Sequence, residues 1–316
     1  MSPPRGASPL AIWTALGALY VIWGSTYLAI AIAVHTLPPL LSASLRFCVA
    51  GLVLLGIVAI RRGPRLDREG LIGASIVGLL LLVGGNGFIV VAERTVPSGL
   101  TALIIGSVPF WIVVLRWIAR DRIHPSTFVG VAVGFAGVAF LVVPGGSSGE
   151  VDIGGVLLLL VATISWALGT FLAPRLRLPD DALLTTGIQQ LAGGIVLAVA
   201  GAALGEAAHL EPAAWSTESL LALAYLVVFG SLVGFTTYSW LLQHAPVTLV
   251  ATYAYVNPVI AVVLGAVVLA EPITPPTIIG AAIIVAAVAF IVSREGARQR
   301  AARDTAMPRA ATAEAD

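Results

Sequence analysis

Ten apolar segments dominate this 316-residue sequence and constrain its fold more than any other feature. A helix needs about 20 mainly apolar residues to cross a lipid bilayer. Only 10% of the residues are charged, and the mean hydropathy is +1.01, whereas soluble domains carry about 25% charged residues. The sequence therefore predicts an all-α integral membrane protein with ten transmembrane helices. We expect them at 11–34, 38–60, 70–92, 98–119, 126–143, 153–173, 182–204, 218–242, 247–270 and 275–293.

The rest of the composition narrows the class of protein further. The net charge is +1 at pH 7, so no surplus of positive charge indicates a nucleic-acid partner. The single cysteine, Cys48, lies in an apolar run and allows no intrachain disulfide. The loops are short, and the polar tails at 1–10 and 294–316 are expected to be disordered. The lipid bilayer is therefore the main partner that the composition predicts.

The distribution of arginine predicts how the spans are oriented, because positive residues favour cytoplasmic loops. With the N-terminus inside the cell, only Arg94 would lie in a loop on the outer side. Fifteen arginines would lie on the cytoplasmic side: Arg5, Arg61, Arg62, Arg65, Arg68, Arg116, Arg120, Arg122, Arg175, Arg177, Arg294, Arg298, Arg300, Arg303 and Arg309. The sequence therefore predicts a multi-pass protein of the cell inner membrane with both termini in the cytoplasm.

The two halves of the sequence resemble each other at offsets of 143 and then 149 residues. The matched positions are Trp23 with Trp166, Gly51 with Gly194, Gly85 with Gly234, Pro97 with Pro246, Ala102 with Ala251 and Pro109 with Pro258. Each half holds five spans, an odd number, so the second half must enter the membrane upside down. We expect two inverted five-helix repeats, at 11–143 and 153–293. Such repeats are typical of transporters whose solute site lies near the membrane midplane.

Several stretches of the sequence resemble the EamA branch of the drug/metabolite transporter superfamily, in particular its YedA-type exporters. They are LYVIWGSTYLAI at 19–30, PPLLSASLRF at 38–47, GNGFIVVAERTVPSG at 85–99 and ATYAYVNPVIAVVLGAVVLAEPIT at 251–274. The resemblance covers about 11–293. It implies ten helices in two tandem EamA repeats, a location in the plasma membrane, and export of small metabolites or drugs.

Polar and aromatic residues recur inside the predicted spans of both halves. They are Trp23, Tyr27, Arg46, Asn86, Trp166, Gln189, Gln190, Tyr253 and Asn257. Each one alone is more typical of helix packing than of ligand contact. As a set that converges from both halves, they predict a substrate-binding cavity that suits flat or partly apolar small-molecule solutes.

Arg46 lies deep in the second predicted span, and Gln189 occupies the matching position of the other repeat. A charged side chain at this depth is costly, so it should face protein or a water-filled cavity rather than lipid. No Asp or Glu lies inside a predicted span, which leaves Arg46 without a carboxylate partner and gives no support to carboxylate-based proton coupling. Two interpretations stay open: a structural clamp onto backbone and hydroxyl oxygens, or a donor that contacts solute.

Pro109 and Pro258 occupy matching mid-span positions and are candidates for hinges, although static kinks would explain them equally well. Glycine pairs at 130/134 and 230/234 permit close helix packing within the chain or at a homodimer interface. The sequence predicts no catalytic centre, no metal site, no cofactor and no ATP-binding motif, so an enzyme is not expected. The predicted function is alternating-access export of small organic metabolites or drugs. An uncoupled facilitator, a lipid scramblase or an intramembrane enzyme are the alternatives.

Overall fold

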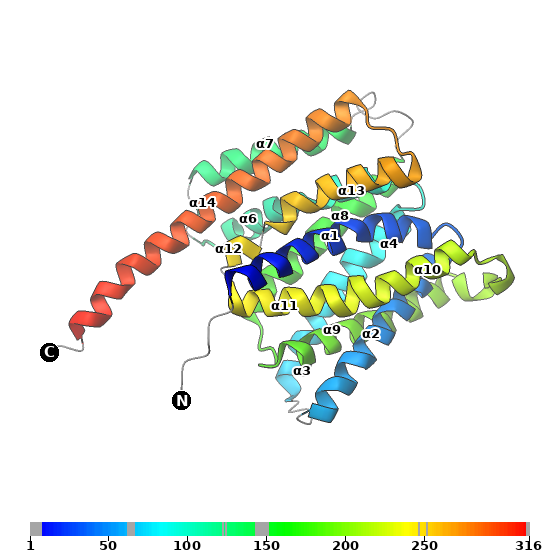
Figure 1. Cartoon of the computed structure of the whole chain (residues 1–316), viewed down its shortest axis with the longest axis horizontal. Helices are drawn as coiled ribbons and strands as arrows, with labels where there is room; N and C mark the ends of the chain where they lie inside the picture. The colour runs from blue at the N-terminus through cyan, green and yellow to red at the C-terminus, as the bar shows by residue number, and fades with distance from the viewer. Residues whose placement is uncertain are drawn as a thin grey trace.

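The computed structural model describes residues 8–61, 67–121, 123, 125–142, 152–245, 247–250 and 252–313. Throughout these ranges the regular secondary structure is helical (Figure 1). Eight spans are long and apolar enough to cross a membrane, and two shorter apolar helices lie at Pro125–Leu141 and Val256–Leu269. Together they give the ten spans expected from the sequence, so the chain is an all-α membrane protein.

The first repeat contains five spans that begin at helix-capping residues or prolines. They are α1 (Pro9–Ala33), α2 (Pro39–Arg61), α3, η1 and α4 as one span (Arg68–Gly78, Leu79–Gly87, Phe88–Ala92), α5 and α6 (Ser98–Ile105, Val108–Ile118), and α7 (Pro125–Val142). Asp67 illustrates the local cause, because its side chain accepts a hydrogen bond from the Gly70 N–H at 3.1 Å. The first turn of a helix has no internal partner for such N–H groups, so the cap fixes where α3 starts.

The second repeat contains the other five spans in the same order. They are α8 (Ile153–Leu172) with the short η2 (Ala173–Arg175), α9 (Ala182–Ala203), α10, η5 and α11 (Thr217–Tyr225, Leu226–Val233, Gly234–His244), α12 and α13 (Val247–Val250, Tyr253–Leu269), and α14 (Pro275–Ala313). The short helices η3 (Glu206–His209) and η4 (Pro212–Ala214) lie in the loop after α9. Asp152 and Asp181 cap α8 and α9.

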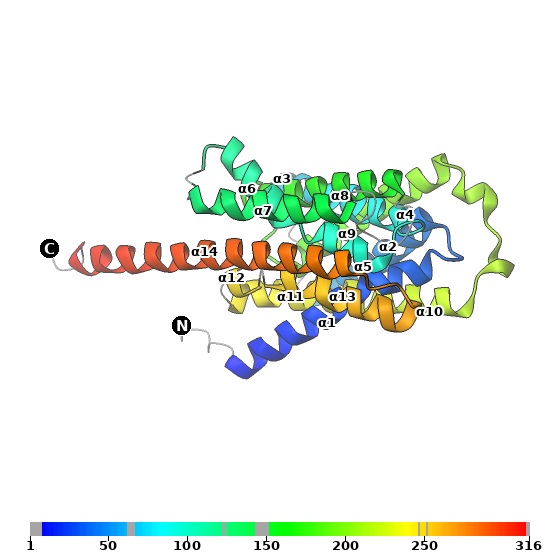
Figure 2. The same ribbon diagram turned by 90° about the horizontal axis from the view of Figure 1, so that it is seen from above.

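Two pairs of corresponding helices pack against each other across the molecule, α2 with α9 and α7 with α14, and α1 packs against α13 of the other repeat (Figures 1 and 2). Glycine allows the α2 and α9 backbones to approach closely. A Cβ added at Gly51 would lie 2.8 Å from the Leu191 nitrogen, and one at the matching Gly194 would lie 2.6 Å from Cys48 Sγ. Small residues at helix crossings are the usual basis of close packing in membranes. The two repeats are therefore interlocked in one bundle.

Two spans that the sequence predicts as continuous are interrupted. The fourth span breaks at Gly106 and Ser107, between α5 and α6. Pro109 follows this break, and proline lacks the N–H that would bond back one turn, which weakens the helix there. The ninth span breaks between Val250 and Tyr253, which separates the short α12 from α13.

The third and eighth spans contain π-helical segments, η1 and η5, which the sequence did not lead us to expect. They occupy matching parts of the two repeats. Gly84, Gly85 and Gly87 lie in η1, and Gly230 lies in η5. Single π-helical turns inside α-helices are frequent at functional sites. Both segments contribute to the site described below.

Helix α14 continues past the predicted end of the tenth span into the polar tail that composition marks as disordered. The helix extends to Ala313 and projects beyond the bundle (Figure 2). Alanine and arginine, which are among the strongest helix formers, are abundant in this segment, and this explains how a polar sequence can prolong the helix.

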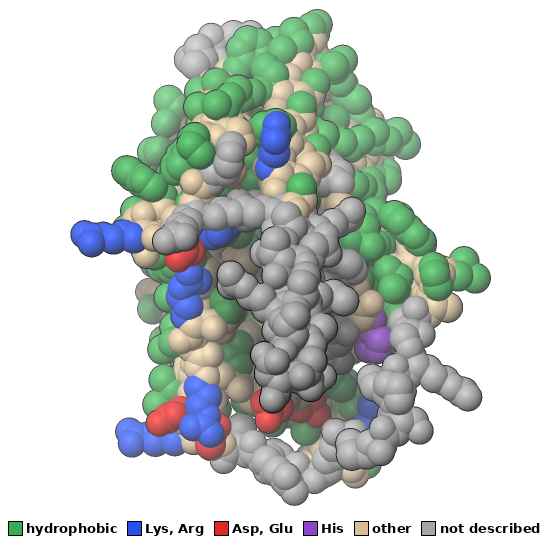
Figure 3. All heavy atoms as spheres, turned by 90° about the vertical axis from the view of Figure 1, so that its left-hand side faces the viewer, with side chains coloured by type: hydrophobic (Ala, Val, Ile, Leu, Met, Phe, Trp, Pro, Cys, Tyr) green, Lys and Arg blue, Asp and Glu red, His purple; other side chains and the backbone are tan. Residues whose placement is uncertain are grey.

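The two ends of the bundle carry different charges. Helix α1 begins and α14 ends on the same side of the molecule, as ten crossings require (Figure 1). We call this side the arginine end, because it holds the described loop and helix-end arginines Arg61, Arg68, Arg116, Arg120, Arg175, Arg177 and Arg294 (Figure 3). We call the opposite side the glutamate end, where Glu93, Glu206 and Glu271 lie at the ends of helices. Helix α8 begins at the glutamate end and α1 at the arginine end, so the two repeats are inverted.

Candidate functional site

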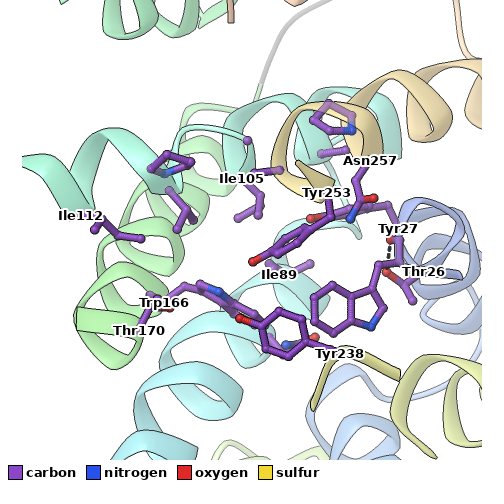
Figure 4. A pocket seen from close by; sticks show the side chains of 18 of the residues that line it. Thr26, Tyr27, Ile89, Ile105, Ile112, Trp166, Thr170, Tyr238, Tyr253 and Asn257 are labelled. Carbon is purple, nitrogen blue, oxygen red and sulfur yellow. Dashed lines mark hydrogen bonds between the residues drawn. The ribbon is translucent and has the colours of Figure 1, made fainter. Parts of the chain in front are cut away.

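A cavity of about 360 Å³ lies between the two repeats. Side chains from α1, α2, η1, α4, α5, α6, α8, α11, α12, α13 and α14 line it, and Figure 4 shows Trp166, Tyr238 and Tyr253 turned toward its centre. Six aromatic residues contribute to the lining: Trp23, Tyr27, Trp166, Phe235, Tyr238 and Tyr253. Ligand sites for small molecules are typically clefts of roughly this size with mainly apolar walls.

Trp23 is the centre of the aromatic wall. Its ring centroid lies 5.4 Å from that of Phe235 and 5.1 Å from those of Tyr238 and Tyr253. A Cβ added at Gly234 would lie 2.5 Å from Trp23 Nε1, so the absence of a side chain at Gly234 makes room for the indole. These contacts hold the wall in place, and edge-to-face pairs of this kind stabilise the arrangement beyond simple burial.

Trp166 of the second repeat packs in an equivalent way on a glycine of the first repeat. A Cβ added at Gly85 of η1 would lie 2.8 Å from Trp166 Cε3. Each cavity tryptophan therefore packs on a glycine of the opposite repeat, and the two glycines are the matched pair Gly85 and Gly234.

Arg46 of α2 reaches the cavity with only 5% of its surface exposed. Its Nε donates to Ser231 Oγ at 2.8 Å, and its guanidinium carbon lies 4.8 Å from the centre of the Phe47 ring. A Cβ added at Gly230 would lie 3.0 Å from Nη2, so this glycine of η5 provides space for the guanidinium. Within the part of the chain that the structure describes, the two terminal nitrogens of Arg46 have no hydrogen-bond or ion-pair partner.

Two asparagines add polar groups to the lining. Asn86 lies in η1 and Asn257 in α13, and both are buried. The Asn257 side-chain amide lies 3.3 Å from the carbonyl oxygens of Tyr20 and Tyr253, which positions it to join α1 to α13. The cavity therefore combines an aromatic wall with a few fixed polar groups.

The expectation that Arg46 has no carboxylate nearby was wrong. Glu93, which follows the last residue of α4, is only 6% exposed and interacts electrostatically with Arg46 and with Glu271. Neither oxygen of Glu93 has a hydrogen-bond partner among the described residues. Burial, and then the Glu271 carboxylate, raise the pKa of Glu93, and Arg46 offsets part of this increase. Hydropathy places Glu93 in a loop outside the third span, where we expect exposed side chains. In the structure this loop packs against the bundle, so the side chain of Glu93 is buried.

Gln189 and Gln190 do not line the cavity, which corrects the prediction for α9. Gln190 is fully buried, and its amide oxygen and nitrogen have no partner in the described structure. The Gln189 backbone packs on α3, because a Cβ added at Gly78 would lie 2.5 Å from the Gln189 carbonyl oxygen. The other seven predicted residues, Trp23, Tyr27, Arg46, Asn86, Trp166, Tyr253 and Asn257, are all brought to the cavity.

Pro109 and Pro258 both line the cavity as well. Pro109 is near the start of α6, directly after the interruption, and Pro258 lies inside α13. A Cβ added at Gly106 would lie 3.1 Å from Pro258 Cγ, so the broken part of the fourth span packs on the proline of the ninth.

The glycine pairs pack within the chain. Gly130 faces Ile291 of α14, and Gly134 faces the ring of Phe110 in α6. Gly230 and Gly234 accommodate Arg46 and Trp23, as described above. These contacts account for the four glycines.

Several cavity residues were missed by reasoning from the sequence, although the internal repeat marks them. Thr170 matches Tyr27 at the offset of 143, while Phe235 matches Asn86 and Tyr238 matches Ile89 at the offset of 149. Each residue and its match both line the cavity. Carrying each candidate across to the other repeat would have found Thr170 and Phe235, whereas the match of Tyr238, Ile89, was not itself a candidate.

The glutamate end of the cavity is closed by hydrogen bonds between the repeats. Glu271 accepts from the Ser98 N–H at 2.8 Å, the Ser98 hydroxyl at 2.7 Å and the Gly99 N–H at 3.0 Å. Glu206 accepts from the N–H groups of Leu40 and Leu41 at 3.1 and 2.9 Å. Carboxylates are favoured at helix N-termini, which here are those of α5 and α2.

The cavity extends instead toward the arginine end, where its lining includes Arg116 and Thr170 near the ends of α6 and α8, and Val292 near the end of the tenth span. The repeats are joined at this end by exposed ion pairs, Arg177 with Asp67 at 3.0 Å and Arg175 with Asp121 at 3.1 Å. Exposed pairs of this kind contribute about 0–1 kcal/mol. The connection at the arginine end is therefore the weaker of the two.

Comparison with known proteins places the chain in a family. Residues 10–143 and 153–293 each match the EamA-like transporter family. The chain is 38% identical, over 81% of its length and 82% of the relative, to the uncharacterized inner membrane transporter YedA of Escherichia coli strain K12. It is 26% identical, over 84% of its length and 89% of the relative, to a probable amino-acid metabolite efflux pump of Salmonella typhimurium.

A solved crystal structure shares the fold, with a TM-score of 0.62 at 21% identity over 92% of this chain and 99% of that chain. The chain therefore belongs to the EamA-like transporter family, whose two units correspond to the two repeats of the bundle.

Proposed function

We propose that this EamA-family chain exports small organic solutes across the inner membrane by alternating access. The observation that carries the proposal is the cavity, because matched residues of two inverted repeats line it and it extends toward one end only. Inverted repeats around a central site support such a cycle, in which one repeat rocks against the other. The Escherichia coli and Salmonella typhimurium relatives, by their names, support an inner-membrane location and outward transport.

The arginine end faces the cytoplasm in this proposal, together with both termini, since positive residues favour the cytoplasmic side. The structure then corresponds to an inward-facing form that accepts solute from the cytoplasm. Opening to the outside requires the bonds of Glu206 and Glu271 to helices α2 and α5 to break. The cavity would close meanwhile at the arginine end, where the fourth and ninth spans are already interrupted.

Cysteine labelling tests the orientation. Asp180→Cys lies at the arginine end and Ala208→Cys at the glutamate end, both at exposed positions. In a Cys48→Ala background, an impermeant maleimide added to intact spheroplasts should label Ala208→Cys, and should label Asp180→Cys only after the membrane is opened. Labelling of Asp180→Cys in intact spheroplasts would reverse the orientation.

A reversible cross-link tests alternating access. The Ser216 N–H donates to Thr36 Oγ1 at 3.0 Å, so Thr36→Cys and Ser216→Cys should form a disulfide that keeps the glutamate end closed. Export would be followed through metabolites that cells with the protein retain less than cells without it. Oxidation should stop their release and reduction should restore it, with each single cysteine as control. Continued release from the oxidised double variant would contradict the proposal.

A further inference from the structure

The charges around the cavity are unbalanced. Two arginines, Arg46 and Arg116, line it, and no Asp or Glu does so among the residues that the structure describes. Arg116 lies toward the arginine end and its Nε is 3.3 Å from an Asp121 oxygen. Arg46 is buried, and no carboxylate of the described residues bonds to it. A buried charge is costly unless it is paired, so the centre of the cavity favours an anion.

Arg46 is also held in a fixed position. The bond from Nε to Ser231 Oγ, the space at Gly230 and the Phe47 ring fix the plane of its guanidinium. The two terminal nitrogens remain available, and they form a fork that matches the two oxygens of a carboxylate. The bond to Ser231 is the structural clamp expected from the sequence, and this clamp leaves the terminal nitrogens free for a ligand.

Glu93 does not neutralise the charge of Arg46 through a direct ion pair in the described structure. It interacts with Arg46 electrostatically, but it does not line the cavity, and no ion pair within 4.0 Å joins the two in the described structure. Burial, and then the Glu271 carboxylate, raise the pKa of Glu93.

The rest of the lining determines which apolar part of a solute fits the cavity. The rings of Trp23, Trp166, Tyr238 and Tyr253 surround the central space, and Figure 4 shows three of them converging there. Such faces pack against flat or branched apolar groups. A zwitterion would bring an ammonium group for which no carboxylate lines the described cavity.

We propose that the solute of this site is a small apolar or aromatic monocarboxylate, whose carboxylate accepts hydrogen bonds from the terminal nitrogens of Arg46 while its apolar part packs on the aromatic wall. This inference rests on the proposed transport function and adds the chemical class of what is carried.

Matched pairs of probes test the proposal by calorimetry on the purified protein: phenylacetate with phenylacetamide, and isovalerate with isovaleramide. Each amide keeps the shape of its acid but has no charge. In the wild type we expect each acid to bind at least about tenfold more tightly than its amide, since hydrogen bonds to charged groups are the stronger ones. Equal binding of acids and amides would overturn the proposal.

Substitutions then assign the preference to Arg46. Arg46→Gln should remove the preference for acids, whereas Arg46→Lys should retain part of it. Arg61→Gln, at the exposed end of the same helix, is the matched control and should keep the preference. An undiminished preference in Arg46→Gln would overturn the proposal. If Arg46→Gln does not fold, the proposal is tested by the acid and amide pairs on the wild type and by the reduced preference for acids expected of Arg46→Lys.

Flux of the same probes from preloaded vesicles separates this inference from the proposed function. Release of amides but not acids would leave the transport function intact and overturn the monocarboxylate. Binding of acids without release of either probe would support the site and contradict transport.

Discussion

The two repeats contribute almost the same geometry to the cavity but not the same charge. Trp23 packs on Gly234, and its match Trp166 packs on Gly85 in the opposite direction across the molecule. Arg46, by contrast, reaches the cavity, while Gln189 at the matching position packs on α3 instead. The duplicated backbone thus supplies the walls of the cavity, and one repeat alone supplies the charged side chains of the described lining. Solute preference can therefore change at one position without disturbing the symmetric frame.

The largest loss of stability is expected at Gly85 and Gly234, where the contacts of the two repeats are most alike. Alanine at either position would place a Cβ within 2.8 Å of a tryptophan ring. Overpacking of this kind costs about 1–3 kcal/mol, and we expect values near the upper limit because the rings have other neighbours. Thermal unfolding of the two variants should show similar losses of stability.

Gly17→Ala is the control for this comparison. Nothing lies within 4 Å of a Cβ added at Gly17, and alanine favours helix, so its stability should hold or rise. A large loss in only one of the two variants at Gly85 and Gly234 would show that the repeats are less symmetric than their contacts indicate.

An intermediate effect is expected at the glutamate end, where the second repeat supplies both capping acids. Glu271→Gln retains one acceptor oxygen but directs an amide group at N–H donors of α5. We expect a loss of about 1–2 kcal/mol, because bonds to a charged group are replaced. Thermal unfolding measures the loss. Glu211→Gln, at an exposed position, is the control and should have no effect. Equal unfolding temperatures for both variants would show that Glu271 does not hold this end closed.

The smallest effect on stability is expected at Pro109 and Pro258, whose importance would lie in motion. Alanine at either position supplies an N–H that can close a helical hydrogen bond and stiffen the span. Stability should change little, while solute release from vesicles should slow and binding should persist. The double variant should be slower than either single one. Unchanged release from the double variant would identify both prolines as static kinks.

The sequence predicted those parts of the structure that depend on hydropathy and on the repeat. The ten spans follow from apolar length, and seven of the nine candidate residues reach the cavity. Gln189 and Gln190 were misassigned because α9 has apolar residues on all sides, so its sequence does not reveal which face meets α2 and α3. The burial of Glu93 depends on how a loop folds back onto the bundle, and the π-helical segments depend on packing between spans. Neither leaves a periodic signal in the sequence.

The π-helical segments also affect how the chain tolerates insertions and deletions. A π-helical turn closes its hydrogen bonds one residue further along than an α-helical turn, so it accommodates an additional residue without breaking the span. Loss of one residue within η1 would let the segment revert toward regular α-helix, and the residues beyond it would keep close to their present orientation. Ile89, which follows η1 in α4, would then stay at the cavity, whereas loss of one residue from a regular α-helix would rotate everything beyond it by about 100°. The third and eighth spans should therefore tolerate a single-residue deletion better inside their π-helical segments than outside them.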